Sequence, residues 1–210
     1  MKGLANPDSK IYGLLNKFVL LMHLNLLVVL CSLPVITIGA TTSAMHTVIL
    51  KIYRSEEKHV SSDFFKAFKA NFKNGTILWM LLVFILAVLI AGVLAAMYYI
   101  PHVSFYVLLV CVALGLSFIL LINWALILQS RYVYTVGQSL KYGLLAWMKY
   151  PGSTFVYLIA IAIPIMLCYS VYIWPIVVCI GITLPQMMSA FLYNRVFDEM
   201  EGVPTHLPKL

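Results

Sequence analysis

The chain has 210 residues, of which 63% are hydrophobic and only 10% are charged, and its formal net charge is +7. A soluble domain carries about 25% charged residues because its surface faces water, so this composition excludes a soluble globular protein. Apolar runs of roughly 20 residues, the length that crosses a bilayer as one helix, recur along the sequence. We therefore expect an all-α, polytopic membrane protein with a single integral membrane domain over residues 1–210.

The first apolar region, residues 18–53, contains the polar stretch SLPVITIGATTSAM, which begins at Ser32 and includes Pro34. The region is either one kinked helix or a hairpin of two helices. Basic residues gather in short cytoplasmic loops, and a basic cluster stands on each side of this region. A single crossing would leave one cluster outside, so the charge pattern predicts a hairpin with a helix break at Pro34. Because the second helix of this hairpin is short, residues 36–50 either span fully or form a re-entrant segment.

Residues 61–75, SSDFFKAFKANFKNG, have the pattern of an amphipathic helix. Three phenylalanines recur at positions i, i+3 and i+7, and three lysines repeat this spacing one residue later: Phe65, Phe68, Phe72, Lys66, Lys69 and Lys73. Ser61 or Ser62 can cap its start, and Gly75 is a natural stop. We expect an interfacial helix whose lysines bind anionic lipid headgroups. Docking to a protein partner is the alternative use of the same surface.

Four clear apolar runs follow: Thr76–Ile100, Val103–Leu128, Thr154–Ile173 and Pro175–Tyr193. They pair into a second hairpin over residues 76–128 and a third over residues 153–194. The segment 139–152 between them, SLKYGLLAWMKYPG, is a looser interfacial segment, and a short cytoplasmic tail occupies 195–210. Whether the two units of interfacial segment plus hairpin arose by duplication stays open.

One assumption places all 14 Lys and Arg residues on one side of the membrane: six helices in three hairpins, with both termini cytoplasmic. The seven acidic residues fall in the same segments. The outer turns, around Leu33–Thr37, Pro101–His102 and Trp174–Pro175, carry no charge. These positions indicate a membrane surface as the partner of the basic residues and argue against nucleic acid.

Polar chemistry inside the predicted spans is sparse. No Asp, Glu, Lys or Arg falls within a span, and no metal-binding or nucleophile–base motif is present, so we expect no enzyme activity, metal or cofactor. The notable polar residues are His23, Thr42, His46 and Asn123, and Thr42 and His46 share one helix face. Either they form hydrogen bonds between helices, worth about 0.6 kcal/mol each, or they line an intramembrane polar site.

Prolines and small residues add two weaker signals. Pro164 and Pro185 lie inside the predicted fifth and sixth helices. A pair of interrupted helices marks the binding site in many transporters, although prolines also simply kink membrane helices. Ala87, Ala91 and Ala95, spaced by four, mark a close helix contact within the protein or between copies in a homo-oligomer.

The segments NLLVVLCSLPVITIGATTSAM and SSDFFKAFKANFKNGTILW resemble the front half of the bacterial YesL-like membrane proteins, a family of unknown function. The likeness runs from about Asn6 to Trp79, and the later hairpins match in pattern only. It implies a bacterial cytoplasmic membrane protein, often encoded beside carbohydrate-uptake and polysaccharide-utilisation systems. It implies no catalytic residues, because the family has no established activity.

Two functions fit these observations. An accessory component of carbohydrate uptake would act by contact with transporter subunits, and its basic helix 61–75 would matter most. A small autonomous transporter or channel would depend instead on intramembrane residues such as His46 and Asn123.

A topology reporter tests the six-helix arrangement. An alkaline phosphatase domain fused after His102 is expected to be active, since this enzyme needs the oxidising side of the membrane and the turn is predicted to lie there. An inactive phosphatase fusion, together with activity of a cytoplasmic reporter fused at the same position, would contradict the arrangement.

Overall fold

A computed structural model of the chain describes residues 10–56, 59–100, 104–168 and 181–201, and its regular structure there is helical, without a strand. The elements in chain order are α1 (Lys10–Ser32), η1 (Val35–Thr37), α2 (Ile38–Arg54), α3 (Val60–Tyr99), α4 (Ser104–Gln129), α5 (Val136–Lys149), α6 (Pro151–Cys168) and α8 (Thr183–Glu201). The expected all-α class is confirmed for these residues.

Four of the described helices are long and apolar enough to cross a membrane: α1, α2, α3 and α4. The count rises to five if α5 and α6, which meet at a bend of 105°, form one span. The predicted turns at Pro101–His102 and Trp174–Pro175 include residues outside those described, and the arrangement of six spans stays a prediction. Several apolar helices of this length fit an integral membrane protein.

The first apolar region consists of two helices, α1 and α2, and not of one kinked helix. The chain leaves α1 after Ser32, passes Pro34 and the short helix η1, and enters α2 at Ile38. The hydroxyl groups of Thr37 and Thr41 donate to the carbonyl oxygen of Cys31, at 2.6 and 3.2 Å. This carbonyl lies in the last turn of α1, where helix carbonyls lack a partner in their own helix. The two threonines thus satisfy the end of α1 within an apolar region.

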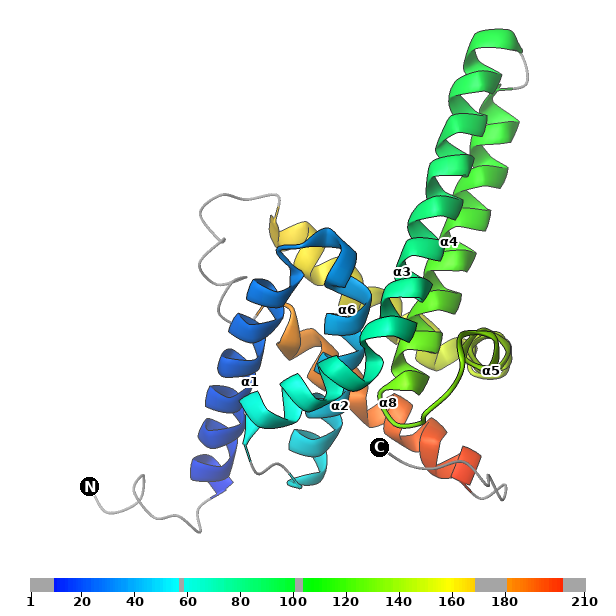
Figure 1. Cartoon of the computed structure of the whole chain (residues 1–210). Coiled ribbons are helices and arrows are strands. Elements are labelled where there is room, and N and C mark those ends of the chain that lie inside the picture. The colour runs from blue at the N-terminus through cyan, green and yellow to red at the C-terminus, as the bar shows by residue number, and fades with distance from the viewer. Residues whose placement is uncertain (1–9, 57–58, 101–103, 169–180, 202–210) are drawn as a thin grey trace.

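Helix α3 is continuous over 40 residues, so the expectation that Gly75 ends an amphipathic helix is wrong. A glycine stops a helix by adopting a left-handed conformation, but Gly75 has a negative φ. It lies on the buried face of α3, in line with Phe64, Ala67 and Asn71. In Figure 1, the cyan first part of α3 lies beside α2, and the green remainder extends away with α4. The amphipathic section and the following span are therefore parts of one helix.

The backbones of α2 and α3 touch at Gly39 and Gly75. A Cβ atom at Gly39 would overlap the carbonyl oxygen of Gly75 and lie 2.7 Å from the Cβ atom of Trp79. A Cβ atom at Gly75 would lie 3.0 Å from backbone atoms of Ala40. The contact at Gly39 is closer than a side chain tolerates, and the contact at Gly75 is so tight that the neighbouring backbone would have to shift, so the crossing requires glycine on α2 and favours it on α3.

Helix α2 lies at the centre of the packed body. It contacts α1, α3, α4 and α8, and 67% of its candidate span is buried, against 11% for the spans of α3 and α4. Figure 1 shows why α3 and α4 are so exposed, because their green outer parts project from the body as a pair. We call this projecting pair, residues 83–99 and 105–116, the arm.

The crossing gives a direct stability prediction. Gly39→Ala is expected to cost about 1–3 kcal/mol, the usual penalty of overpacking, because the new methyl group meets backbone atoms that cannot rotate away. Unfolding of the detergent-purified protein by heat or denaturant measures this loss.

The matched control is Gly92→Ala on α3, where a Cβ atom would meet nothing within 4 Å. Alanine there is expected to be neutral or to stabilise by up to about 1 kcal/mol, since it is the better helix former. Equal stability of the two variants would contradict the crossing.

Candidate functional site

The four polar residues singled out in the sequence have separate partners. His23, exposed on α1, is 2.9 Å from the hydroxyl group of Ser61 on α3. Thr42 donates to the carbonyl oxygen of Ile38, and Asn123 donates to that of Ile119, each within its own helix. Among the described residues, no hydrogen bond joins any two of the four predicted site residues. Thr42 and Asn123 thus bond within their own helices, and His23 bonds a neighbouring helix.

His46 is the exception, because it connects three helices. It is fully buried on α2, and its Nε2 atom lies 2.8 Å from the hydroxyl oxygen of Tyr157 on α6. The ring of Tyr193 on α8 meets the imidazole edge to face, with 5.6 Å between the ring centroids. The helix periodicity that pairs Thr42 with His46 does not reveal these aromatic partners, which lie more than 100 residues away in sequence.

Asn25, which the sequence pattern did not single out as a site residue, fastens the start of α8. It is fully buried on α1, and its side-chain oxygen accepts hydrogen bonds from the backbone N–H groups of Ile182 and Thr183, at 3.1 and 3.0 Å. The Thr183 hydroxyl group donates in return to the carbonyl oxygen of Leu21. Free N–H groups at a helix start need such acceptors, and here another helix supplies one.

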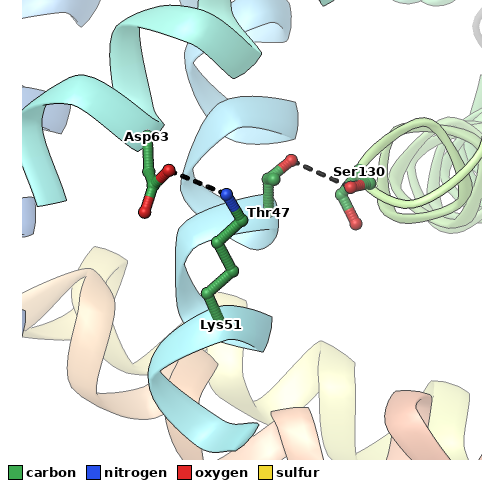
Figure 2. Close-up of polar contacts among 4 residues, drawn as sticks. All are labelled: Thr47, Lys51, Asp63 and Ser130. Atoms are coloured by element: carbon green, nitrogen blue, oxygen red, sulfur yellow. Dashed lines mark hydrogen bonds and ion pairs between the residues drawn. The ribbon is translucent and has the colours of Figure 1, made fainter. Parts of the chain in front are cut away.

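The charged end of α2 carries a second group of links, which Figure 2 shows in part. Lys51 Nζ forms an ion pair with Asp63 Oδ1 on α3, at a distance of 2.8 Å. One turn earlier, the Thr47 hydroxyl group donates to the carbonyl oxygen of Ser130, just after α4, at 2.9 Å. We call the surface around these groups, on the Thr47–Lys51 side of α2, the inner-end site, after the expectation that the basic residues lie on the inner side of the membrane.

Arg54 extends this group to α8. Its Nε and Nη2 atoms both donate to Asn194 Oδ1, at 3.0 and 2.6 Å. Three consecutive turns of α2 therefore bond to the α4–α5 connection, to α3 and to α8. Thr47 and Lys51 are four residues apart and therefore share a helix face, but this spacing does not identify their partners.

An aromatic cluster adjoins the inner-end site through Arg131. Tyr132 and Tyr134 follow α4, with ring centroids 5.3 Å apart, and Tyr132 packs against Phe197 on α8 at 5.8 Å. The guanidinium group of Arg131 lies 5.2 Å from the centre of the Phe197 ring, an attractive cation–π distance. Burial, with the neighbouring Tyr142, raises the pKa of Tyr134, which keeps this hydroxyl group neutral at physiological pH.

The first part of α3 has three distinct sectors. Its buried sector packs against α2, and Phe68 is partly buried beside it. Phe65 and Phe72 are 51% and 44% exposed. The three lysines, Lys66, Lys69 and Lys73, are exposed on the sector furthest from the core. The helix thus presents aromatic and basic side chains outward, as interfacial helices do, while it is also anchored to the body.

The prolines have different roles from those expected. Helix α6 continues past Pro164 to Cys168, so the expected interruption there is not seen. Pro185 lies in the first turn of α8, where the missing N–H group of proline costs little. The sharp bend of this region lies instead between Lys149 and Pro151. Of the three prolines predicted to break helices, Pro34 is the one that lies between two described helices.

Asn25→Ala tests the link between α1 and α8. Losing the acceptor is expected to destabilise the protein by about 0.5–2 kcal/mol, as other lost helix caps do. Hydrogen exchange of the backbone amides at the start of α8 should become faster. Asn16→Ala, an exposed position on the same helix, shares the change in helix propensity and is expected to leave this exchange unchanged. Equal protection of α8 in the two variants would contradict the cap.

Comparison with known proteins covers only the front of the chain. Residues 21–93 match the profile of a family described as "Protein of unknown function, DUF624". This stretch is about a third of the chain and contains Gly39, Gly75 and the Lys51–Asp63 ion pair. Neither a curated protein nor a solved structure matches the chain. The chain is thus an integral membrane protein whose first helices are similar to a family without an assigned activity.

Proposed function

We propose that this protein is an accessory component of the membrane that acts by contact with a partner, in bacterial carbohydrate uptake or utilisation. The observation that carries the proposal is the arm, which projects from the body (Figure 1) and whose apolar side chains are exposed. The carbohydrate connection comes from the resemblance of the front half to the YesL-like proteins.

The arm has the surface expected for packing against another membrane helix. Between α3 and α4 lies an apolar groove of about 320 Å³. Its walls include Leu86, Leu94, Leu108 and Leu116, and Gly115 lies at its base, where a Cβ atom would touch Leu86 at 3.5 Å. Small residues and grooves let membrane helices approach closely. A helix of a transporter subunit is the occupant that we propose.

The intramembrane polar groups support a contact role more than a transport path. Asn25 caps α8, His46 bonds Tyr157, and Asn123 bonds its own helix. A polar path for a solute needs polar groups that are available to that solute. In the described part of the chain, each of these three side chains makes a hydrogen bond within the protein.

A specific observation favours the alternative, a small autonomous transporter or channel. Polar atoms on the facing sides of α2 and α8 are buried with no hydrogen-bond partner among the described residues: Ser43 Oγ, His46 Nδ1, Gln186 Oε1 and Tyr193 OH. Buried polar atoms without partners are costly and often mark sites that a water or a solute occupies. Under this alternative, His46 would contact the solute.

One experiment separates the two functions. A photo-crosslinking amino acid at Leu94 on the arm, in the native membrane, is expected to capture a transporter subunit that mass spectrometry identifies. The same probe at Leu26 on α1, which is also exposed, serves as the positional control and should capture less. Capture of a second copy of the chain at Leu94 would replace the proposed partner by a homo-oligomer.

Charge-reversal variants add a second part to this experiment. The triple change of Lys66, Lys69 and Lys73 to glutamate should reduce the captured subunit, because the basic sector no longer holds α3 against anionic headgroups or the partner. Reversal of Lys17, Lys141 and Lys149 changes the net charge equally and should not reduce the captured subunit. His46→Gln and Asn123→Ala should keep the crosslink. No capture, together with solute flux in vesicles that His46→Gln abolishes, would establish the alternative.

A further inference from the structure

Two cavities at the inner-end site share part of their lining. The first, of about 220 Å³, is lined in part by Arg54, Glu56 and Arg131, and the second, of about 290 Å³, in part by Asp63 and Lys66. Thr47 and Lys51 belong to both linings. Each cavity is far larger than one water molecule needs, so each has room for a polar group with several oxygen atoms.

Basic side chains outnumber acidic ones in these linings. The four basic residues are Lys51, Arg54, Lys66 and Arg131, and the two acidic residues are Glu56 and Asp63. The basic residues come from α2, from the start of α3 and from the connection after α4, and of these Lys51 lines both cavities. Leu50 adds apolar surface to the first cavity, and Ala67 and Ala70 add it to the second.

The basic groups are held in place before any ligand arrives. Lys51 is bonded to Asp63, Arg54 to the amide oxygen of Asn194, and Arg131 lies over the ring of Phe197. An ammonium group has three N–H donors, and the bond to Asp63 uses one of the three on Lys51. Its side chain is 36% exposed, so the other donors are accessible from the cavities. Such preorganisation lowers the entropic cost of binding.

We propose that the inner-end site binds a phosphate group, with Lys51 as its central ligand. A phosphate group offers several strong acceptor oxygens, and Lys and Arg are the residues that bind it best. The group comes either from an anionic phospholipid headgroup or from a free phosphate compound. The site lies apart from the arm, so it stands whether or not the arm binds a partner.

Binding of two probes to the full-length protein in neutral detergent tests the site. Inorganic phosphate is titrated calorimetrically at constant ionic strength, and phosphatidylglycerol is added in steps and counted by native mass spectrometry. Binding of both probes shows that the phosphate group itself is recognised. Binding of inorganic phosphate alone supports a free compound as the source, and binding of phosphatidylglycerol alone supports the lipid. If neither probe binds, the proposal is overturned.

The variants separate a specific site from general charge. The double change Lys51→Gln with Asp63→Asn removes the central ligand without altering the net charge or leaving an unpaired carboxylate. It should weaken binding of the probe at least about tenfold, the factor that 1.4 kcal/mol represents. Lys141→Gln on α5 lowers the net charge by one at an exposed position outside both linings, and it should bind as the unchanged protein does.

A third variant tests the site independently, in case the double variant does not fold. Lys66→Gln alters a single exposed side chain at the rim of the second cavity, and it should weaken binding severalfold while the thermal unfolding temperature stays the same. If the double variant and Lys66→Gln both bind as tightly as the unchanged protein, the inner-end site does not hold the phosphate group.

Discussion

The backbone contact between Gly39 and Gly75 is the constraint on which the arrangement of the other helices depends. Because neither residue has a Cβ atom, the start of α2 lies directly against the middle of α3. This contact gives α3 two different surroundings. Its first part packs along α2 and turns lysines and phenylalanines outward, while its second part continues past the body and pairs with α4. One helix thus joins the packed body to the arm.

Hydrogen bonds from α2 and α1 then fix the remaining helices. In an apolar environment a polar group without a partner is costly, so each buried bond holds its two helices in one relative position. His46 bonds α6, Arg54 bonds α8, and Asn25 caps α8 from α1. The polar residues of the membrane interior therefore serve mainly to orient helices. The charged groups at the inner end, where cavities adjoin them, have capacity for a ligand as well.

The two proposed contacts use different physics at different places. The arm offers apolar area and a groove, which suit van der Waals packing with another helix. The inner-end site offers basic groups around a polar cavity, which suit an anion. Helix α3 connects the two places, because Leu94 belongs to the arm and Asp63 to the inner-end site. A lipid phosphate bound at Lys51 would thereby hold the body, and with it the arm, at a defined depth in the bilayer.

The sequence by itself determined the helical membrane class, the break at Pro34 and the basic-aromatic section of α3, because hydrophobic runs, proline and helical spacing act locally. It misread Gly75, since a glycine that ends a helix and a glycine that admits a neighbouring backbone look alike in sequence. Only the tertiary structure placed Tyr157 beside His46, Asn25 beside the start of α8, and Asp63 beside Lys51. These contacts depend on how helices cross, and local periodicity carries no information about the partner across the crossing.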